Sequence, residues 1–533
     1  MHGNRPTVSS LNGVVAAAHP LAAQAGARLL NEGGNAFDAA VATAAALNVV
    51  EPYMSGLAGM GVATCYVAAE KRVRALDFVT AIPENLPVER FRVREDLLRG
   101  ALAVGAPGNF AGWSEMSRAH GRKSMREALA PAIALARGGF PLIEFNVDEI
   151  NGVSAELRGH AALYDAWARN YTAGTGGATP GAILKQPDLA ATLESLAESG
   201  ATLLHGGALG RAVVAHLQSL GGCLTLGDLE RVRPVWQEPL VASYRGLAIH
   251  VPPPSCEAFQ YLLTLRILEG FDIAAMERNG AAYLDLVWRA IRLAAGVRIA
   301  DNNPTPERLA HMLSDGHVET LRARVRDGVP VVGPTEQWTE TPGAAAAEGH
   351  TTSFSIADRD GNVVCLTQSL GSVFGSGVVV PGTGVCLNNF LYWADVNPRS
   401  PNRSKPGGPL PVCVAPSVAL RDGRPVLALG TPGSYGILQT QVQALLQHVD
   451  FGLPLQAAIE APRARLMDGV EVVAEGRLAP AVLATLGGRG HAVETLPGWT
   501  MKVGGMQGVA IDPATGAMTG AADPRRDGYV VAV

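Results

Sequence analysis

The chain has 533 residues, of which 47% are hydrophobic and 17% charged, a composition typical of globular proteins with large apolar cores. The net charge of -5, with no long Lys/Arg run, excludes nucleic acid and anionic lipid surfaces as expected partners. The first thirty residues lack the unbroken apolar core of a signal peptide, so the sequence predicts a cytoplasmic protein.

Two helices are predicted in residues 19–50, separated by the breaker "NEGGNA". The second, "FDAAVATAAALNVV", is too short to span a bilayer and is alanine-rich, as a packed helix would be. Two β-like runs follow, "GVATCYVAA" and "VRALDF". The glycine-rich turn "GAPGNFAGW" then enters a helix, and residues 114–300 are predicted to be mostly helical.

From Thr351 onward the pattern is β-rich: "TTSFSIA", "VVCLTQS", "GVVV", "SVALRDGRPVLALG", "VEVVA" and "GVAID", with one helix at "LQTQVQALLQHV". The boundary between the helix-rich and β-rich halves lies at residues 344–350. Its alanine run at 344–347 is expected to be a flexible loop. This order of elements predicts an α+β protein.

Cysteine and histidine spacing gives no sign of a metal centre or a cofactor. The six cysteines are far apart with no C-x-x-C pair, so buried free thiols are expected rather than a zinc knuckle or disulfide framework. The twelve histidines form no H-E-x-x-H or comparable group. No G-x-S-x-G elbow occurs either, which disfavours a serine hydrolase of that type.

The segment "DRDGN", residues 358–362, predicts a hairpin closed by a three-residue loop with Gly361 in the left-handed region. That loop sets Thr351 opposite Ser369, which places a second hydroxyl beside the first residue of the strand. A two-residue loop would shift the register by one and turn Ser369 to the other face.

Such a strand suits an autoproteolytic N-terminal nucleophile. Cleavage between His350 and Thr351 would free an α-amino group, which in unstructured peptides has a pKa of about 7.7 to 8.0. Near neutral pH such an amine is able to act as general base for the threonine hydroxyl. The alternative is that Thr351 and Thr352 are ordinary β-favouring residues.

Further motifs occur in order along nearly the whole chain: "EGGNAFDAAVATAAALNVVEPYMSGLAGMG", "GAPGNFAGW", "HTTSFSIADRDGNVV", "FGSGVVVPGTGVCLNN", "APSVAL", "GTPGS" and "APRARL". Together they resemble the γ-glutamyltransferase (γ-glutamyl transpeptidase) family of N-terminal nucleophile hydrolases. The resemblance implies a four-layer αββα sandwich. It also implies a precursor cut into a large subunit, residues 1–350, ending in a flexible linker, and a small subunit, residues 351–533.

The resemblance also implies roles for individual residues. Thr351 would be the nucleophile, following the cut after His350, and Ser369 would be the second hydroxyl that polarises it. The backbone N–H groups of Gly433 and Ser434 would form the oxyanion hole. The implied reaction is attack on an amide carbonyl, an acyl ester on the threonine, and release to water or to an amine.

Several substrate-binding positions depart from the family pattern, and together they remove the groups that hold a zwitterionic γ-glutamyl head. The arginine for the α-carboxylate is Val79, and the aspartate for the α-amino group falls at about Trp393. The remaining departures are Phe390, Gly371, Val412 and Cys413. Because a buried charge without a partner is costly, these residues predict a non-glutamyl acyl group, oxamate-like or acylase-like. Retained γ-glutamyl activity through other contacts is the alternative.

The expected partners are a small-molecule amide and the two subunits of one precursor, and a homodimer of processed units is a further candidate assembly. A different class of function is an uncleaved binding protein that has kept only the scaffold. An intact chain on a denaturing gel after long incubation would indicate that class.

Overall fold

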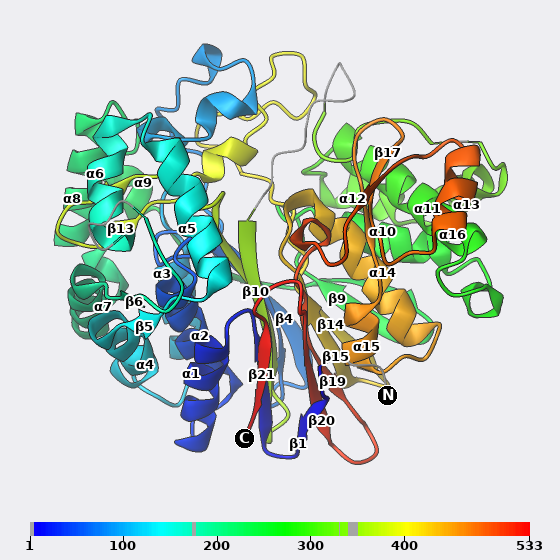
Figure 1. Ribbon diagram of the computed structural model, residues 1–533, viewed down its shortest axis with the longest axis horizontal. Helices are drawn as coiled ribbons and strands as arrows, with labels where there is room; N and C mark the ends of the chain where they lie inside the picture. The colour runs from blue at the N-terminus through cyan, green and yellow to red at the C-terminus, as the bar shows by residue number, and fades with distance from the viewer. Residues whose placement is uncertain (1–4, 173–176, 330, 339–349) are drawn as a thin grey trace.

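The computed structural model describes residues 5–172, 177–329, 331–338 and 350–533. Two seven-stranded sheets stack face to face, and helices cover the outer face of each (Figure 1). The four layers are therefore helix, sheet, sheet and helix, which confirms the αββα class. The alanine run at 344–347 and the linker expected there lie outside the described residues.

The first sheet is antiparallel throughout and carries the predicted nucleophile. Across the sheet its strands are β21 (Tyr529–Ala532), β2 (Gly13–Ala17), β10 (His350–Asp358), β11 (Val363–Gly371), β3 (Met60–Val67), β4 (Arg72–Asp77) and β7 (Val235–Gln237). Strands that precede residue 350 in the sequence and strands that begin at or after it both contribute to this sheet, so the two predicted subunits share it.

The second sheet is also antiparallel and also mixes both halves of the chain. Its strands are β1 (Val8–Ser10), β20 (Met518–Ala522), β19 (Gln507–Ile511), β15 (Arg424–Gly430), β14 (Ser417–Arg421), β9 (Leu247–Val251) and β8 (Leu240–Tyr244).

The helices divide into two groups, one on each side of the sheets in Figure 1. Beside the first sheet lie α1 (Pro20–Asn31), α2 (Ala36–Val50), α3 (Asn109–His120), α4 (Met125–Gly138), α5 (Glu144–Leu157), α6 (Ala161–Tyr171), α7 (Pro187–Ser199), α8 (Ala208–Ser219) and α9 (Leu226–Glu230). Beside the second lie α10 (Phe259–Leu268), α11 (Ala281–Ala300), α12 (Pro306–Met312), α13 (Asp315–Arg326), α14 (Ile437–Val449), α15 (Leu455–Glu460) and α16 (Pro480–Gly488).

Smaller elements complete the described chain. The short strands are β5 (Phe140–Pro141) with β6 (Ile183–Leu184), β12 (Val379–Val380) with β13 (Val385–Cys386), and the sheet of β16 (Ala464–Leu466), β17 (Glu471–Glu475) and β18 (Ala492–Leu496). The 3-10 helices are η1 (Val88–Arg90), η2 (Arg94–Leu97), η3 (Ala101–Ala103), η4 (Ala201–Leu203), η5 (Ile273–Ala275), η6 (Phe390–Trp393), η7 (Ser434–Gly436) and η8 (Met501–Val503).

Apolar cores fill the spaces between the layers. One lies between the two sheets, and the two larger ones lie between each sheet and its helices. The six cysteines are all free, and every one except Cys223 is buried, which confirms the predicted thiols. In the part of the chain that the structure describes, no helix combines the length and the apolarity needed to cross a membrane.

Helix α2 extends from the turn of the β10–β11 hairpin to the end of the first sheet at which Thr351 lies. It begins where Asp358 Oδ2 accepts a hydrogen bond from the backbone N–H of Ala36 at 2.8 Å, and all 15 of its residues are buried. A 15-residue helix spans roughly 22 Å, about the length of seven residues of strand. Since the helix starts beside the turn of the hairpin, its last turn and Glu51 reach the opposite end of β10.

Candidate active site

The β10–β11 hairpin has the register predicted with the three-residue loop. Ala357 pairs with Val363, and Thr352 pairs with Gln368. Gly361 has a φ of +87° and donates its N–H to the Asp358 carbonyl at 3.1 Å, which closes the loop. At the far end the register shifts between His350 and Thr352. The strand therefore carries a bulge where the reaction is expected.

Thr351 and Ser369 meet beside the peptide bond that the sequence predicts to be cut. Thr351 Oγ1 donates to Ser369 Oγ at 3.3 Å, and Ser369 Oγ donates to the His350 carbonyl oxygen at 2.6 Å. The backbone N–H of Gly371 donates to Ser369 Oγ at 2.8 Å, which fixes the serine hydroxyl. The hydroxyl of the predicted nucleophile thus lies next to a carbonyl that accepts a hydrogen bond from Ser369.

Two buried ionisable groups lie beside Thr351 and Thr352, one at the end of α2 and one in the C-terminal segment. Thr352 Oγ1 donates to Glu51 Oε2 at 3.0 Å, and Arg526 Nη1 donates to the Thr351 carbonyl at 2.8 Å. Burial raises the pKa of Glu51 to about 7, although the charge of Arg526 and the hydrogen bond from Thr352 oppose the rise. The sequence reasoning missed both groups, because a single acidic residue after a helix and the run "DPRRDG" carry no spacing signal.

His350 is buried beside another carboxylate. Its Nε2 lies 3.8 Å from Glu149 Oε2, on helix α5. The side chain of the residue before the predicted cut therefore contacts the helical layer, whereas its backbone belongs to β10 together with Thr351.

The candidate oxyanion residues follow the end of β15. Gly433 has a φ of +131°, and Ser434 has a φ of +57°, a region that costs a residue with a side chain about 1 to 2 kcal/mol. A Cβ on Gly430 would lie 2.2 Å from Ser353 Oγ, so β15 approaches β10 closely just before this turn. The role of the two N–H groups stays a prediction.

Five of the six departures from the family pattern belong to, or pack against, one large apolar core cluster, and we call these five residues the acyl pocket after the role predicted for them. Its members are Val79, Phe390, Trp393, Val412 and Cys413. All except Val79, which is partly exposed, are buried. Burial raises the pKa of the Cys413 thiol well above its usual range, so this thiol is an inert packing group.

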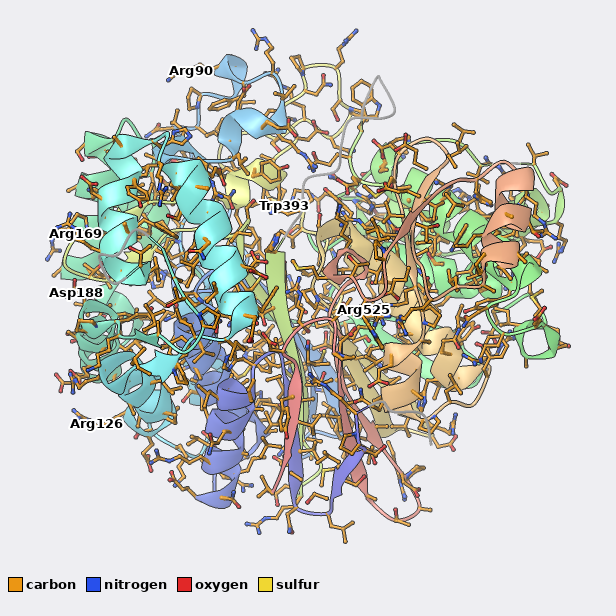
Figure 2. All side chains as sticks on the ribbon, in the orientation of Figure 1. Arg90, Arg126, Arg169, Asp188, Trp393 and Arg525 are labelled. Carbon is orange, nitrogen blue, oxygen red and sulfur yellow. The ribbon has the colours of Figure 1, made fainter. Side chains whose placement is uncertain are left out.

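The acyl pocket adjoins the candidate oxyanion turn through an aromatic contact. The Trp393 ring packs edge to face on Tyr435, with 5.6 Å between ring centroids, and Tyr435 directly follows Ser434. In the view of Figure 2, Trp393 lies above the central strands. A substituent bound beside this tryptophan would therefore reach toward the turn.

Gly371 has a structural reason to lack a side chain. Its φ is +101°, and a Cβ there would lie 2.2 Å from Asn389 Oδ1. Asn389 fills that space and accepts a hydrogen bond from the Ser372 N–H at 2.8 Å. An asparagine at 371 would not fit unless Asn389 moved.

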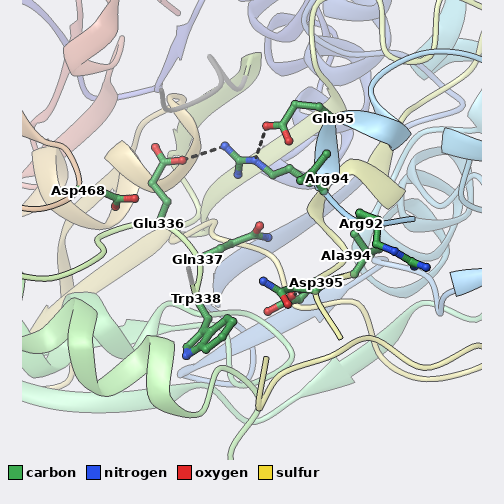
Figure 3. Close-up of a pocket in the computed structure, with 12 residues that line it drawn as sticks. Arg92, Arg94, Glu95, Glu336, Gln337, Trp338, Ala394, Asp395 and Asp468 are labelled. Carbon is green, nitrogen blue, oxygen red and sulfur yellow. Dashed lines mark hydrogen bonds and ion pairs between the residues drawn. The ribbon is translucent and has the colours of Figure 1, made fainter. Parts of the chain in front are cut away.

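A charged cavity of about 160 Å³ lies beside the acyl pocket, and nothing in the sequence motifs indicated it (Figure 3). Arg94 lies 3.1 Å from Glu336, which in turn lies 2.6 Å from Arg465. Gln337 in the same wall donates to the Trp393 carbonyl at 2.9 Å. Arg94, Glu336 and Arg465 are therefore paired with one another. No group of three metal-ligating side chains occurs within the described ranges of the chain.

The αββα sandwich, whose central strand β10 carries Thr351 as its second residue, is the fold of the N-terminal nucleophile hydrolases. The family profile described as gamma-glutamyltranspeptidase matches residues 22–533. The chain belongs to the γ-glutamyltranspeptidase family, as the motifs indicated, and is accordingly an enzyme of amide hydrolysis and acyl transfer.

Relatives and solved structures agree with this assignment. The chain is 34% identical to the Acylase ACY 1 proenzyme of Pseudomonas sp. (strain SE83), over 98% of this chain and 94% of that protein. It is 32% identical to the glutathione hydrolase proenzyme of Bacillus subtilis (strain 168), over 98% and 92%. The structure of cephalosporin acylase from Bacillus halodurans superposes with a TM-score of 0.91 at 29% identity, covering 100% of this chain and 98% of that one.

Proposed function

We propose that this protein is an autoprocessing amidohydrolase that uses Thr351 as an N-terminal nucleophile and accepts a non-glutamyl acyl group. The observation that carries the proposal is the chain of hydrogen bonds from Thr351 Oγ1 through Ser369 Oγ to the His350 carbonyl. It joins the nucleophile to the bond that must be cut first.

Maturation begins with attack of Thr351 Oγ1 on the His350 carbonyl carbon. The Ser369 hydroxyl stabilises the negative charge that forms on the carbonyl oxygen. The C–N bond then breaks, the nitrogen takes up a proton, and an ester joins His350 to the threonine oxygen. Water hydrolyses the ester and leaves residues 1–350 with a new carboxylate and residues 351–533 with a new α-amine. The two subunits remain interleaved, because both sheets contain strands of each.

The processed threonine then acts on the substrate amide. Its free α-amine serves as general base for the hydroxyl, which attacks the substrate carbonyl and forms an acyl ester. The N–H groups of Gly433 and Ser434 stabilise the oxyanion, and Ser369 polarises the nucleophile. Water then releases the acyl group from Thr351 by hydrolysis of the ester, in preference to transfer of the acyl group to a second amine.

Specificity for a non-glutamyl acyl group rests on the acyl pocket. Its side chains offer no charge to an ammonium or a carboxylate, and the rim pairs of Arg94 with Glu336 are already satisfied. Similarity to proteins named acylases supports this reading. Similarity to proteins named glutathione hydrolases supports γ-glutamyl hydrolysis as the second candidate, for which Arg94 and Asp395 in the neighbouring cavity would have to hold the head group.

The test combines mass spectrometry with a substrate panel. Purified protein should resolve into fragments that end at His350 and begin at Thr351. Incubation with simple aliphatic, aromatic and oxo-acid amides should give a transient acyl adduct on the Thr351 peptide, whereas glutathione should give little. An uncut chain without any adduct would contradict the proposal and favour the binding-protein class.

Dimerisation of processed units and a cytoplasmic location are further proposals, which sedimentation and cell fractionation would test.

A further inference from the structure

Glu51 is a buried carboxylate that the proposed reaction does not use. Its side chain has no exposed surface, and it caps the end of α2 directly beneath β10. Oε2 accepts the Thr352 hydroxyl at 3.0 Å, whereas Oε1 is buried and finds no hydrogen-bond donor among the described residues. A carboxylate oxygen in that position is costly unless a donor reaches it.

Charged groups from two segments act on Glu51, and one of them also contacts Thr351, the residue that would become the new N-terminus. Arg526 is the largest influence that favours the ionised form of Glu51, and it also donates to the Thr351 carbonyl. Asp527, from the same segment, and Glu149, from α5, oppose the ionisation of Glu51. Tyr53 is buried in the loop after α2, and its hydroxyl accepts a hydrogen bond from Asn146.

Cleavage changes this environment in one respect. The Thr351 amide offers a single N–H within a peptide bond, whereas the α-amine offers up to three N–H donors and can carry a positive charge. That charge appears one residue away from Thr352, whose hydroxyl already contacts Glu51. Glu51 is thus a buried carboxylate with an unmatched oxygen that is bonded to the neighbour of the residue that gains the charge.

We propose that Glu51 is a positioning residue that acts as the counter-charge of the α-amino group released on Thr351. This inference rests on the proposed function, since it requires the cut. In the uncut chain Glu51 is partly protonated near neutral pH. After the cut the ammonium and the carboxylate stabilise each other, so they titrate as a coupled pair, and Glu51 makes the amine harder to deprotonate. The midpoint of the acidic limb of the pH–rate profile then lies at a higher pH than it would for an amine without this counter-charge.

The test is the pH dependence of kcat/KM for a simple amide substrate, measured on processed wild type and on Glu51→Gln. The amide keeps a hydrogen-bond acceptor for Thr352 but removes the charge. Opposite charges several Å apart, at an effective dielectric constant of about 20, shift a pKa by roughly one to two units. The acidic limb of Glu51→Gln should therefore move to lower pH by about one unit.

Two further variants separate charge from packing. Thr352→Val keeps the Glu51 carboxylate but removes the hydrogen bond from Thr352 that favours its ionisation. The acidic limb should therefore also move to lower pH, but by less than in Glu51→Gln. If Glu51→Gln does not fold, the shift in Thr352→Val tests the inference. Glu198→Gln, an exposed carboxylate paired with Arg126, should keep the wild-type profile.

The outcomes are distinct. A limb at unchanged pH in Glu51→Gln, with a lower rate at every pH, would show that Glu51 only supports packing and would overturn the inference while leaving the proposed function intact. A wild-type chain that is neither cut nor active would overturn the proposed function and this inference with it.

Discussion

The nucleophile region and the acyl pocket are built in opposite ways. The hydroxyls and the carbonyl of the nucleophile region all lie within one hairpin, residues 350–371, and hydrogen-bond directly to one another. The acyl pocket gathers apolar side chains from segments far apart in sequence, from Val79 to Cys413. A local hairpin can keep its chemistry while distant pocket residues change one at a time. This difference is consistent with the prediction that the family's reaction is retained while its usual head-group contacts are replaced.

The largest expected effect concerns the nucleophile itself. Thr351→Ala should abolish both cleavage and amide hydrolysis, because it removes the hydroxyl that contacts Ser369 beside the His350 carbonyl and that attacks in both reactions. A denaturing gel should show one uncut chain. Thr352→Ala is the matched control, since it changes the neighbouring threonine, whose hydroxyl bonds to Glu51 instead, and should still be cut. Cleavage of Thr351→Ala at the same bond would show that another group performs the reaction.

Loss of the second hydroxyl should slow the chemistry without abolishing it. Ser369→Ala removes the donor to the His350 carbonyl and should slow processing by about 10²- to 10³-fold, the usual effect of losing one oxyanion donor. Time-resolved mass spectrometry of freshly made protein measures the rate. Ser369→Thr should recover most of it, because the hydroxyl is kept. Equal processing rates for Ser369→Ala and wild type would remove this residue from the site.

Restoring charges should change the acyl pocket and leave the nucleophile alone. Val79→Arg together with Trp393→Asp should raise turnover of γ-glutamyl anilide at least about tenfold and lower turnover of simple amides. Trp393→Asp alone buries an unpaired charge and should cost a few kcal/mol of stability, whereas Val79→Arg alone, at a partly exposed position, should cost less. Val79→Leu with Trp393→Phe controls for volume changes without charge. A wild-type enzyme that prefers glutathione to all simple amides would show that the acyl pocket does accept the zwitterionic head group.

Glu51 should make stability depend on pH in the uncut chain. Its pKa of about 7 lies above the unfolded value, so the folded state binds its proton more tightly. The stabilisation is complete below about pH 4.5 and is lost as pH rises through about 7, by on the order of 3 kcal/mol. The urea midpoint of Thr351→Ala should therefore decrease as the pH is raised from 5 to 8. The midpoint of the double variant, Thr351→Ala with Glu51→Gln, should decrease less. Parallel curves for the two proteins would contradict the raised pKa.

The smallest expected effect concerns the candidate oxyanion turn. Ser434→Gly keeps the backbone N–H and relieves a left-handed residue, so activity should stay within a few-fold and stability should change by no more than about 1 kcal/mol. Steady-state kinetics and thermal melting measure both. Ser434→Pro, which lacks the N–H, should lose activity strongly. A large loss in Ser434→Gly would assign a role to the buried hydroxyl.

The local elements could be predicted because their signals are local. The breaker between α1 and α2, the alternation of β10 and β11, and the loop with Gly361 are each written within a few residues. The placement of Thr351 beside Ser369 followed from counting outward from that loop, since strand pairing has a period of two. The motifs in their order were sufficient for the family.

Contacts between distant segments had no such signal. Arg94, Glu336 and Arg465 meet only because η2, the end of the first half and β16 converge in space. Glu51 reaches Thr352 because α2 runs the length of β10 before it ends, and Arg526 arrives from the segment before β21. The sequence by itself determined the hairpin that carries Thr351 and Ser369, and it predicted that the γ-glutamyl clamp is absent. Tertiary structure alone decided which buried charges surround Thr351, because burial and approach of side chains depend on packing between layers and not on spacing along the chain.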